Sequence, residues 1–218
     1  MINKRLKQIA DFTNNNSNVI DVGCDHAYLS IYLIKNNIAK SVIASDLNKG
    51  PLDIAITNIK KDNLEDKITV SLGYGIETIK KETDTVIISG MGGVTINEIL
   101  TKDEKLLSNV NTLILSPNSE HYEVRKKLTD LGYLILDEVI IKEKNKYYLI
   151  IKAKKGNKDY SEIELKYGPV LIKQKTLIFI EYCNYLIDKY QKILIGIPKN
   201  KTDNINKEID NIKKIIDK

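Results

Sequence analysis

The chain has 218 residues, of which 42% are hydrophobic, and its 34 basic and 29 acidic side chains give a net charge of +5. This length accommodates one α/β domain of about 150 residues and a smaller additional element. No apolar run approaches the roughly 20 residues of a membrane span, and the charge permits nucleic-acid binding without requiring it. The polar N-terminal segment lacks a secretion signal, so we expect a cytoplasmic protein with two reduced cysteines, Cys24 and Cys183.

The first part of the chain alternates the patterns of strands and helices. Residues 4–12 carry Leu6, Ile9 and Ala10 at helical spacing, which predicts a short amphipathic helix before the first strand. Apolar runs then predict buried parallel strands, and the amphipathic segments between them predict helices. We expect strands at residues 19–22, 42–44, 68–72, 85–89 and 112–115, and helices at residues 28–36, 49–60, 94–100 and 120–131.

Two further β-rich runs, residues 133–141 and 147–153, are separated by only five residues. A connection this short cannot make a parallel crossover, so the two runs form an antiparallel hairpin. Five βα units followed by such a hairpin give seven strands with one reversed. This is the layout of the Rossmann-like methyltransferase sheet.

The last part of the chain is predicted to be helical. Ile163, Val170 and Leu177 recur every seven residues, and a second heptad pattern follows from Ile180. The break at Gly196-Ile197-Pro198 separates these positions from another apolar stripe, which predicts a coiled-coil hairpin of two helices. We therefore divide the chain into a methyltransferase domain, residues 1–156, and a helical tail, residues 157–218. The pattern alone is compatible with three roles for the tail: binding a partner, packing on the core, or dimerisation.

The segment V-I-D-V-G-C-D-H-A-Y-L, residues 19–29, has the pattern of a nucleotide site in a parallel sheet. Gly23 allows a tight turn after the first strand, and Asp46 at the end of the second strand is placed to accept the hydroxyls of an adenosine ribose. The turn lacks the second and third glycines of a dinucleotide fingerprint and carries Asp25. An acid there repels a pyrophosphate but can receive the ammonium of a methionine moiety, which favours S-adenosylmethionine over NAD. The alternative is an ordinary βα turn in another Rossmann-like enzyme.

Other strand ends converge on the same place. Gly73-Tyr74-Gly75 is expected beside the adenine, and Gly90-Met91-Gly92-Gly93 beside the methionine end, although glycine-rich turns into helices are common in any protein. Asn118 follows the fifth strand, after a proline that fixes the backbone and so presents the Asn118 amide rigidly. The alternative is a loop asparagine whose hydrogen bonds are all made within the protein. The residues predicted to hold the cofactor are Asp21, Gly23, Asp25, Asp46, Leu47, Gly73, Tyr74, Gly75, Gly90, Met91 and Gly92.

Asp25 and His26 are the strongest catalytic candidates, with Tyr28 and Asn118 beside them. Methyl transfer depends mainly on positioning the nucleophile in line with the methyl carbon, and a carboxylate can stabilise the charge that an adenine gains on methylation. Asp25 fits that role or the binding of the cofactor's ammonium. His26 fits a hydrogen bond to the substrate base or a cap on the next helix, and Tyr28 fits stacking on a flipped base or the edge of the core. With two histidines and no cluster of metal-type ligands, we expect no metal site.

Several motifs together resemble a known family. D-V-G-C-D-H-A-Y-L, S-D-L-N, I-S-G-M-G-G and L-S-P-N, in this order and before a heptad-patterned tail, are similar to the bacterial tRNA (adenine(22)-N(1))-methyltransferases. The resemblance covers essentially the whole chain. It implies S-adenosylmethionine as methyl donor, N1 of an adenosine in the D-arm region of tRNA as acceptor, and the tail as a tRNA-binding element.

A basic rim is the expected contact with RNA phosphates. Lysines crowd the predicted hairpin turn and the exit from the last strand, although each one individually is as well explained by solubility. The residues predicted to bind RNA are Arg5, Lys142, Lys144, Lys146, Lys154 and Lys155.

Two other functions compete with a tRNA methyltransferase. A small-molecule methyltransferase usually carries a lid over its cleft, and the sequence offers no candidate lid. A non-catalytic RNA- or protein-binding module would have lost its cofactor residues, whereas Asp21, Gly23, Asp25 and Asp46 are all present.

Overall fold

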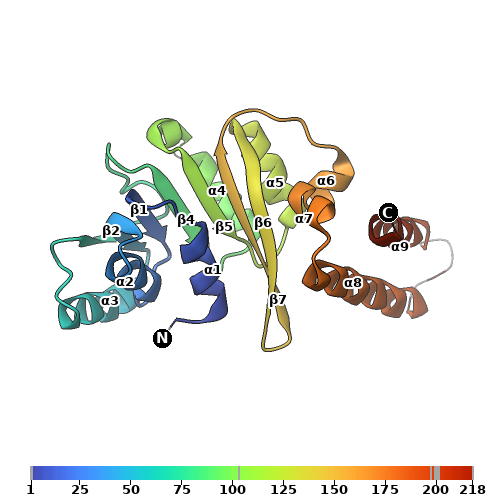
Figure 1. Ribbon diagram of the computed structural model, residues 1–218, viewed down its shortest axis with the longest axis horizontal. Coiled ribbons are helices and arrows are strands. Elements are labelled where there is room, and N and C mark those ends of the chain that lie inside the picture. Colours follow the sequence, from blue (N-terminus) through green and yellow to red (C-terminus); the bar gives the residue numbers. More distant parts are fainter. Residues whose placement is uncertain (1, 103, 197, 199–201, 218) are drawn as a thin grey trace.

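The computed structural model describes residues 2–102, 104–196, 198 and 202–217. A seven-stranded sheet in the order β3-β2-β1-β4-β5-β7-β6 runs through the molecule (Figure 1). β7 is antiparallel to both of its neighbours, and the other pairs are parallel. The strands are β1 (Ser17–Val22), β2 (Ala39–Asp46), β3 (Ile68–Leu72), β4 (Thr85–Ser89), β5 (Thr112–Ser116), β6 (Tyr133–Glu143) and β7 (Lys146–Lys155). The predicted seven-stranded Rossmann-like fold with one reversed strand is confirmed.

Helices cover both faces of the sheet. One face packs against α1 (Lys4–Phe12), α2 (Tyr28–Lys35) and α3 (Lys49–Lys61). The other packs against α4 (Gly93–Lys102) and α5 (His121–Asp130), with a 3₁₀ helix (Glu104–Asn109) before β5. Burial on both faces explains the continuous apolar runs, since in β4 Val86 and Ile88 enter one core cluster and Ile87 enters the other.

The unit after β3 differs from the predicted βα repeat. Residues 73–84 connect β3 to β4 through turns and contain no helix. The alternation of strand and helix therefore fails at this point, although the strands on either side are correctly placed.

The helical tail consists of α6 (Glu162–Tyr167), α7 (Pro169–Gln174), α8 (Leu177–Ile195) and α9 (Asp203–Asp217), which gather at the β6 end of the sheet (Figure 1). The single long helix implied by Ile163, Val170 and Leu177 is wrong. Gly168 has a positive φ of 96° and Pro169 starts α7 without a backbone donor, so the helix stops there. α8 and α9 pack against each other, and Ile197 of the predicted break lies outside the described residues.

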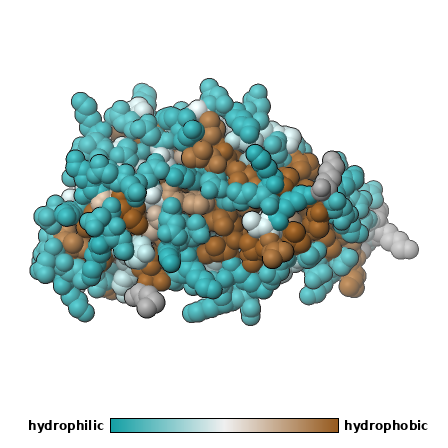
Figure 2. Space-filling view, viewed as in Figure 1, coloured by the Kyte–Doolittle hydropathy of each residue, from teal (hydrophilic) through white to brown (hydrophobic). Residues whose placement is uncertain are grey.

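The tail shares its core with the sheet. Leu171, Phe179, Cys183 and Ile212 belong to the same buried cluster as β4 and β5. Figure 2 shows a largely hydrophilic surface with hydrophobic side chains gathered near the middle of the face, where β6 and α7 lie in Figure 1. Among the described residues, none of the helices combines the length and hydrophobicity needed to cross a bilayer.

Candidate active site

A pocket of about 450 Å³ opens at the carboxyl ends of the parallel strands. This edge is where open α/β sheets bind ligands, at the point where the strand order reverses between β1 and β4. The pocket is lined by Arg5, Leu6, Asp21, Val22, Gly23, Cys24, Asp25, Tyr28, Leu29, Asp46, Leu47, Asn48, Gly73, Tyr74, Gly75, Ser89, Gly90, Met91, Thr95 and Ile99. Of the residues predicted to hold the cofactor, Gly92 alone does not line it.

The turn after β1 fixes the floor of the pocket. Gly23 has a φ of 71° and its N–H donates to the Ser45 carbonyl at 2.8 Å, which ties the turn to β2. A side chain at Gly23 would collide with the Met91 methyl group, so the absence of a Cβ lets the two loops meet.

The Asp46 carboxylate is held by backbone donors at the end of β2. Oδ1 accepts from the Asn48 N–H at 2.9 Å, and Oδ2 accepts from the Asp25 N–H at 3.2 Å. The carboxylate is therefore oriented at the mouth of the pocket, where its remaining lone pairs suit ribose hydroxyls.

Asp21 is a buried acid on the wall of the pocket. It is 3% exposed, and its Oδ2 accepts a 2.7 Å hydrogen bond from the Ser30 hydroxyl. Burial raises the pKa of Asp21 to about 6, an effect reinforced by the nearby Asp46 carboxylate. A cationic ligand group beside it would favour the ionised form. Ser30 is not among the residues predicted from the sequence, where it stands as a single serine within the largely apolar segment of α2.

The loop between β1 and α2 carries the predicted catalytic side chains. The Asp25 side chain is 71% exposed, and its Oδ1 lies 3.4 Å from His26 Nε2. The His26 ring meets the Tyr28 ring edge-to-face at 5.6 Å between centroids. Asp25 and Tyr28 line the pocket, whereas His26 stands beside it. His26 does not cap α2, because the N-cap position is Ala27 and has no side-chain hydrogen bond.

Asn118 contacts the loop after β4 and does not line the pocket. Its Nδ2 donates to the Gly90 carbonyl at 2.6 Å, and its backbone N–H donates to the Met91 carbonyl at 2.8 Å. The side chain therefore positions the glycine loop. This contact matches the alternative in which Asn118 makes its hydrogen bonds within the protein.

Arg5, predicted to bind RNA, lies between the loop after β4 and β7. Its guanidinium lies over the Tyr148 ring, 5.1 Å from the centroid, and fills the space above Gly90, whose φ is 82°. Arg5 thus lines the pocket at the carboxyl ends of the strands as well as a neighbouring recess.

The lysines of the predicted rim lie at opposite ends of the strands. Lys144 lies at the hairpin turn and Lys146 begins β7, on the side of the pocket, and the Lys142 ammonium pairs with Glu181. Lys154 pairs in register with Thr112, the first residue of β5, and Lys155 follows it. The expectation that all these lysines form one rim beside the cleft is wrong, because β7 spans the full height of the sheet.

Comparison with known proteins identifies the family. A model of the tRNA (adenine(22)-N(1))-methyltransferase family matches residues 19–218. The chain belongs to this family. The tRNA (adenine(22)-N(1))-methyltransferase of Bacillus subtilis strain 168 is 34% identical over 214 residues, covering 95% of this chain and 90% of the relative.

Two solved structures agree over the whole length. M. capricolum TrmK, in complex with S-adenosyl-homocysteine, superposes with a TM-score of 0.89 at 34% identity and covers 100% of this chain and 98% of its own. Streptococcus pneumoniae Sp1610, in complex with S-adenosyl-L-methionine, has a TM-score of 0.93 at 32% identity over 99% of this chain and 100% of its own. The family predicted from the sequence is confirmed, and with it a methyltransferase that acts on tRNA.

Proposed function

We propose that this chain transfers a methyl group from S-adenosylmethionine to N1 of adenosine 22 in tRNA, using the pocket at the carboxyl ends of β1, β2 and β4. The observation that carries the proposal is the match of the family over residues 19–218, which include nearly the whole lining of that pocket. Relatives of this chain hold the donor and its product, S-adenosyl-homocysteine.

The residues present fit the donor. Asp46 is oriented for the ribose hydroxyls, and Asp21 offers a buried carboxylate for the positively charged methionine end. Gly73, Tyr74 and Gly75 provide backbone and a ring for the adenine, with the Lys102 ammonium 4.9 Å from the centroid of the Tyr74 ring. When bound, S-adenosylmethionine supplies an electrophilic methyl group on a sulfonium.

The chain's own contribution to the reaction is positioning and charge stabilisation. Adenine N1 carries a lone pair and needs no base to become a nucleophile, and the positive charge passes to the ring as its bond to the methyl carbon forms and the sulfur–carbon bond breaks. The exposed Asp25 carboxylate is placed to stabilise that charge by accepting from the exocyclic amine. Tyr28, which is 52% exposed, offers a ring on which the displaced base stacks, and His26 holds that ring edge-to-face.

The finer assignments belong to the same proposal. Residues 1–156 form the methyltransferase part, and residues 157–218 with the lysines of the hairpin turn contact the tRNA. The substrate being tRNA favours a cytoplasmic location. A small-molecule substrate is disfavoured by the open mouth of the pocket, where Leu47 is 59% exposed.

The test is to incubate the protein with labelled S-adenosylmethionine and unmodified tRNA, and to locate the methyl by mass spectrometry of nuclease fragments. We expect one methyl on the fragment containing nucleotide 22 and none on a matched transcript with guanosine at that position. Methylation elsewhere, or of the guanosine transcript, would contradict the proposal.

A further inference from the structure

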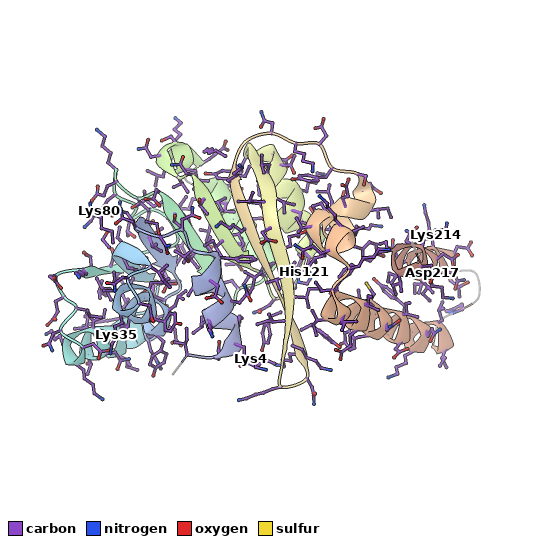
Figure 3. All side chains as sticks on the ribbon, viewed as in Figure 1. Lys4, Lys35, Lys80, His121, Lys214 and Asp217 are labelled. Carbon is purple, nitrogen blue, oxygen red and sulfur yellow. The ribbon has the colours of Figure 1, made fainter. Side chains whose placement is uncertain are left out.

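A second recess, of about 680 Å³, lies on the far side of Arg5 from the cofactor pocket. It is formed where α1, the loop after β5, the β6–β7 hairpin and α8 meet, and Figure 3 shows His121 in this region between the hairpin and α8. We call it the tyrosine recess. Its lining consists of Arg5, Asn118, Ser119, His121, Asn145, Lys146, Tyr147, Tyr148, Tyr182, Tyr185, Leu186 and Lys189.

Aromatic rings dominate this lining. The Tyr147 ring lies 5.2 Å from both Tyr182 and Tyr185, and the latter two rings are nearly parallel at 6.4 Å between centroids. Tyr147 is fixed by a 3.0 Å hydrogen bond from its hydroxyl to the Glu181 carboxylate. Tyr185 is 47% exposed, so its ring contacts the other tyrosines and also presents a surface to solvent. Such a rigid cluster is a platform for a flat ligand.

The charge of the recess indicates an anionic ligand. Among the described residues that line it, Arg5, Lys146 and Lys189 are cationic and none is acidic. His121 adds no charge at neutral pH, because burial and the nearby Arg125 lower its pKa to about 4. A flat, anionic ligand of this kind is a nucleotide, whose base stacks on aromatic rings while its phosphate meets ammonium groups.

The recess adjoins the pocket at the carboxyl ends of the strands. Arg5 lines both, and Asn118 in the recess donates to the carbonyl of Gly90 in the pocket. A polynucleotide that placed one base in the pocket would extend directly across Arg5 into the recess.

We infer that the tyrosine recess binds an unpaired nucleotide of the tRNA next to the target adenosine, with its base against Tyr185 and Tyr147 and its phosphates near Lys146 and Lys189. This inference rests on the proposed function and deepens it, because it assigns the substrate contact to side chains of the hairpin and α8. An acidic peptide would also meet the lysines, but the half-exposed Tyr185 ring beside two further tyrosine rings favours a base.

The test compares three full-length variants. Tyr185→Ala removes the stacking surface, Tyr185→Phe keeps the ring without the hydroxyl, and Leu177→Ala shortens a side chain that is 87% exposed on the same helix outside the recess. We expect Tyr185→Ala to raise the tRNA dissociation constant and the KM for tRNA roughly tenfold, the range given by base–aromatic stacking, with the S-adenosylmethionine dissociation constant unchanged. Tyr185→Phe and Leu177→Ala should bind tRNA like the wild type.

A fourth variant tests the phosphate contact without altering the rings. Lys189→Gln should reduce the slope of log affinity against log salt concentration by about one unit. Wild-type tRNA affinity in Tyr185→Ala, or an equal loss in Leu177→Ala, would overturn the inference. If the wild type does not methylate nucleotide 22, the proposed function fails, whereas the recess is judged by the tRNA dissociation constants alone.

Discussion

The buried carboxylate of Asp21 links the pH dependence of stability to the cofactor pocket. Its pKa is about 6 in the folded chain against an ordinary value of 3.8, so between pH 3.8 and 6 the folded state binds more protons than the unfolded state. Stability therefore falls as the pH rises from 3.8 towards 6, and the loss is complete above 6. In its ionised form the Asp21 carboxylate would attract a cationic ligand group in the pocket.

Asp21→Asn should stabilise the ligand-free protein at pH 7 by on the order of 3 kcal/mol, since each pKa unit corresponds to about 1.4 kcal/mol. The amide oxygen still accepts the Ser30 hydrogen bond, and the difference should vanish below pH 4. Urea unfolding at several pH values measures it, with Ser30→Ala as a control for the hydrogen bond. A pH-independent difference between Asp21→Asn and wild type would contradict the assigned pKa.

Asp25 tests the proposed charge stabilisation at the reacting base. Asp25→Ala should lower kcat by roughly 100-fold or more, as loss of a preorganised electrostatic contact does. Its φ of 52° is left-handed, so alanine adds a backbone cost of about 1 kcal/mol, whereas Asp25→Asn removes the charge in a residue that tolerates this conformation. Near-normal methylation by both variants would remove Asp25 from the site.

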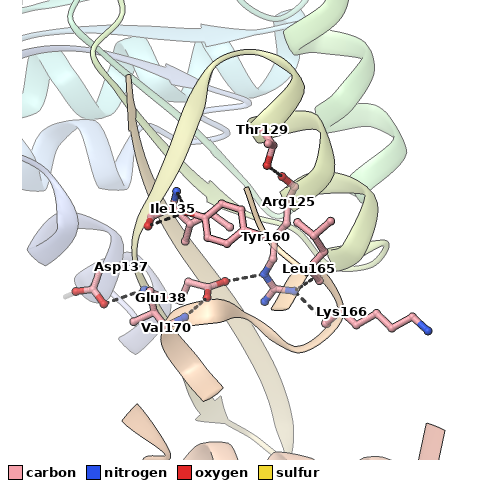
Figure 4. Close-up of polar contacts among 9 residues, drawn as sticks. All are labelled: Arg125, Thr129, Ile135, Asp137, Glu138, Tyr160, Leu165, Lys166 and Val170. Carbon is pink, nitrogen blue, oxygen red and sulfur yellow. Dashed lines mark hydrogen bonds and ion pairs between the residues drawn. The ribbon is translucent and has the colours of Figure 1, made fainter. Parts of the chain in front are cut away.

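At the scale of elements, a buried ion pair fastens the tail to the sheet. Glu138 on β6 accepts from Arg125 Nε on α5 at 2.6 Å and from the Val170 N–H on α7 at 3.1 Å (Figure 4). Arg125 Nη1 donates to the carbonyls of Leu165 and Lys166 in α6. The network joins α5, α6 and α7 to β6 and thereby fixes how α6 and α7 sit against the sheet.

Glu138→Ala should destabilise the protein by about 3–5 kcal/mol, because it leaves the Arg125 guanidinium buried without its counter-charge. The matched control is Lys35→Ala, which breaks the surface pair with Asp62 and should cost at most about 1 kcal/mol. Chemical denaturation of both variants gives the comparison. Equal losses would show that the tail is not held by this network.

The strands and the residues that line the pocket at their carboxyl ends could be predicted from the sequence because their signals are local. A short, continuous apolar run such as residues 85–89 is typical of a buried parallel strand. The carboxyl ends of parallel strands meet at the same edge of the sheet, whatever side chains follow them. The position of Arg5 depends on contacts with Gly90 and Tyr148, far away in the sequence, so no local pattern indicates it. Lys146 and Lys155 stand at opposite ends of a strand about 30 Å long, a separation that the hairpin already implied.

The helix breaks in the tail also depend on tertiary contacts. The seven-residue spacing of Ile163, Val170 and Leu177 fits one continuous helix as well as three separate helices, and breaks in the backbone decide between the two. A Cβ at Gly168 would collide with the Glu138 and Arg125 side chains. The helix break at Gly168 is therefore coupled to the buried ion pair. Local periodicity carries no information about that tertiary contact.

At the scale of the whole molecule, the two parts of the chain share one hydrophobic core. Tyr167, Leu171, Phe179 and Cys183 of the tail are each at most 7% exposed and pack in the cluster that lines one face of the sheet. Glu208 on α9 further accepts from Tyr167 and Lys166. The division at residue 156 is thus a proposed division of roles, and the packing gives no reason for the parts to unfold separately.

A chain truncated after residue 156 should therefore aggregate or lose its cooperative thermal transition, because it exposes the apolar surface that α6, α7 and α8 cover. The intact chain should unfold in one transition, with equal calorimetric and van't Hoff enthalpies. A matched control is the full-length chain with Tyr185→Ala and Lys189→Gln, which alters the tail's exposed surface and leaves its packing in place. Should the truncated chain stay monomeric, melt cooperatively and bind S-adenosylmethionine like the wild type, the tail would be an independent tRNA-binding element. If instead the double variant binds S-adenosylmethionine and the truncated chain does not, the tail supports the sheet that forms the pocket.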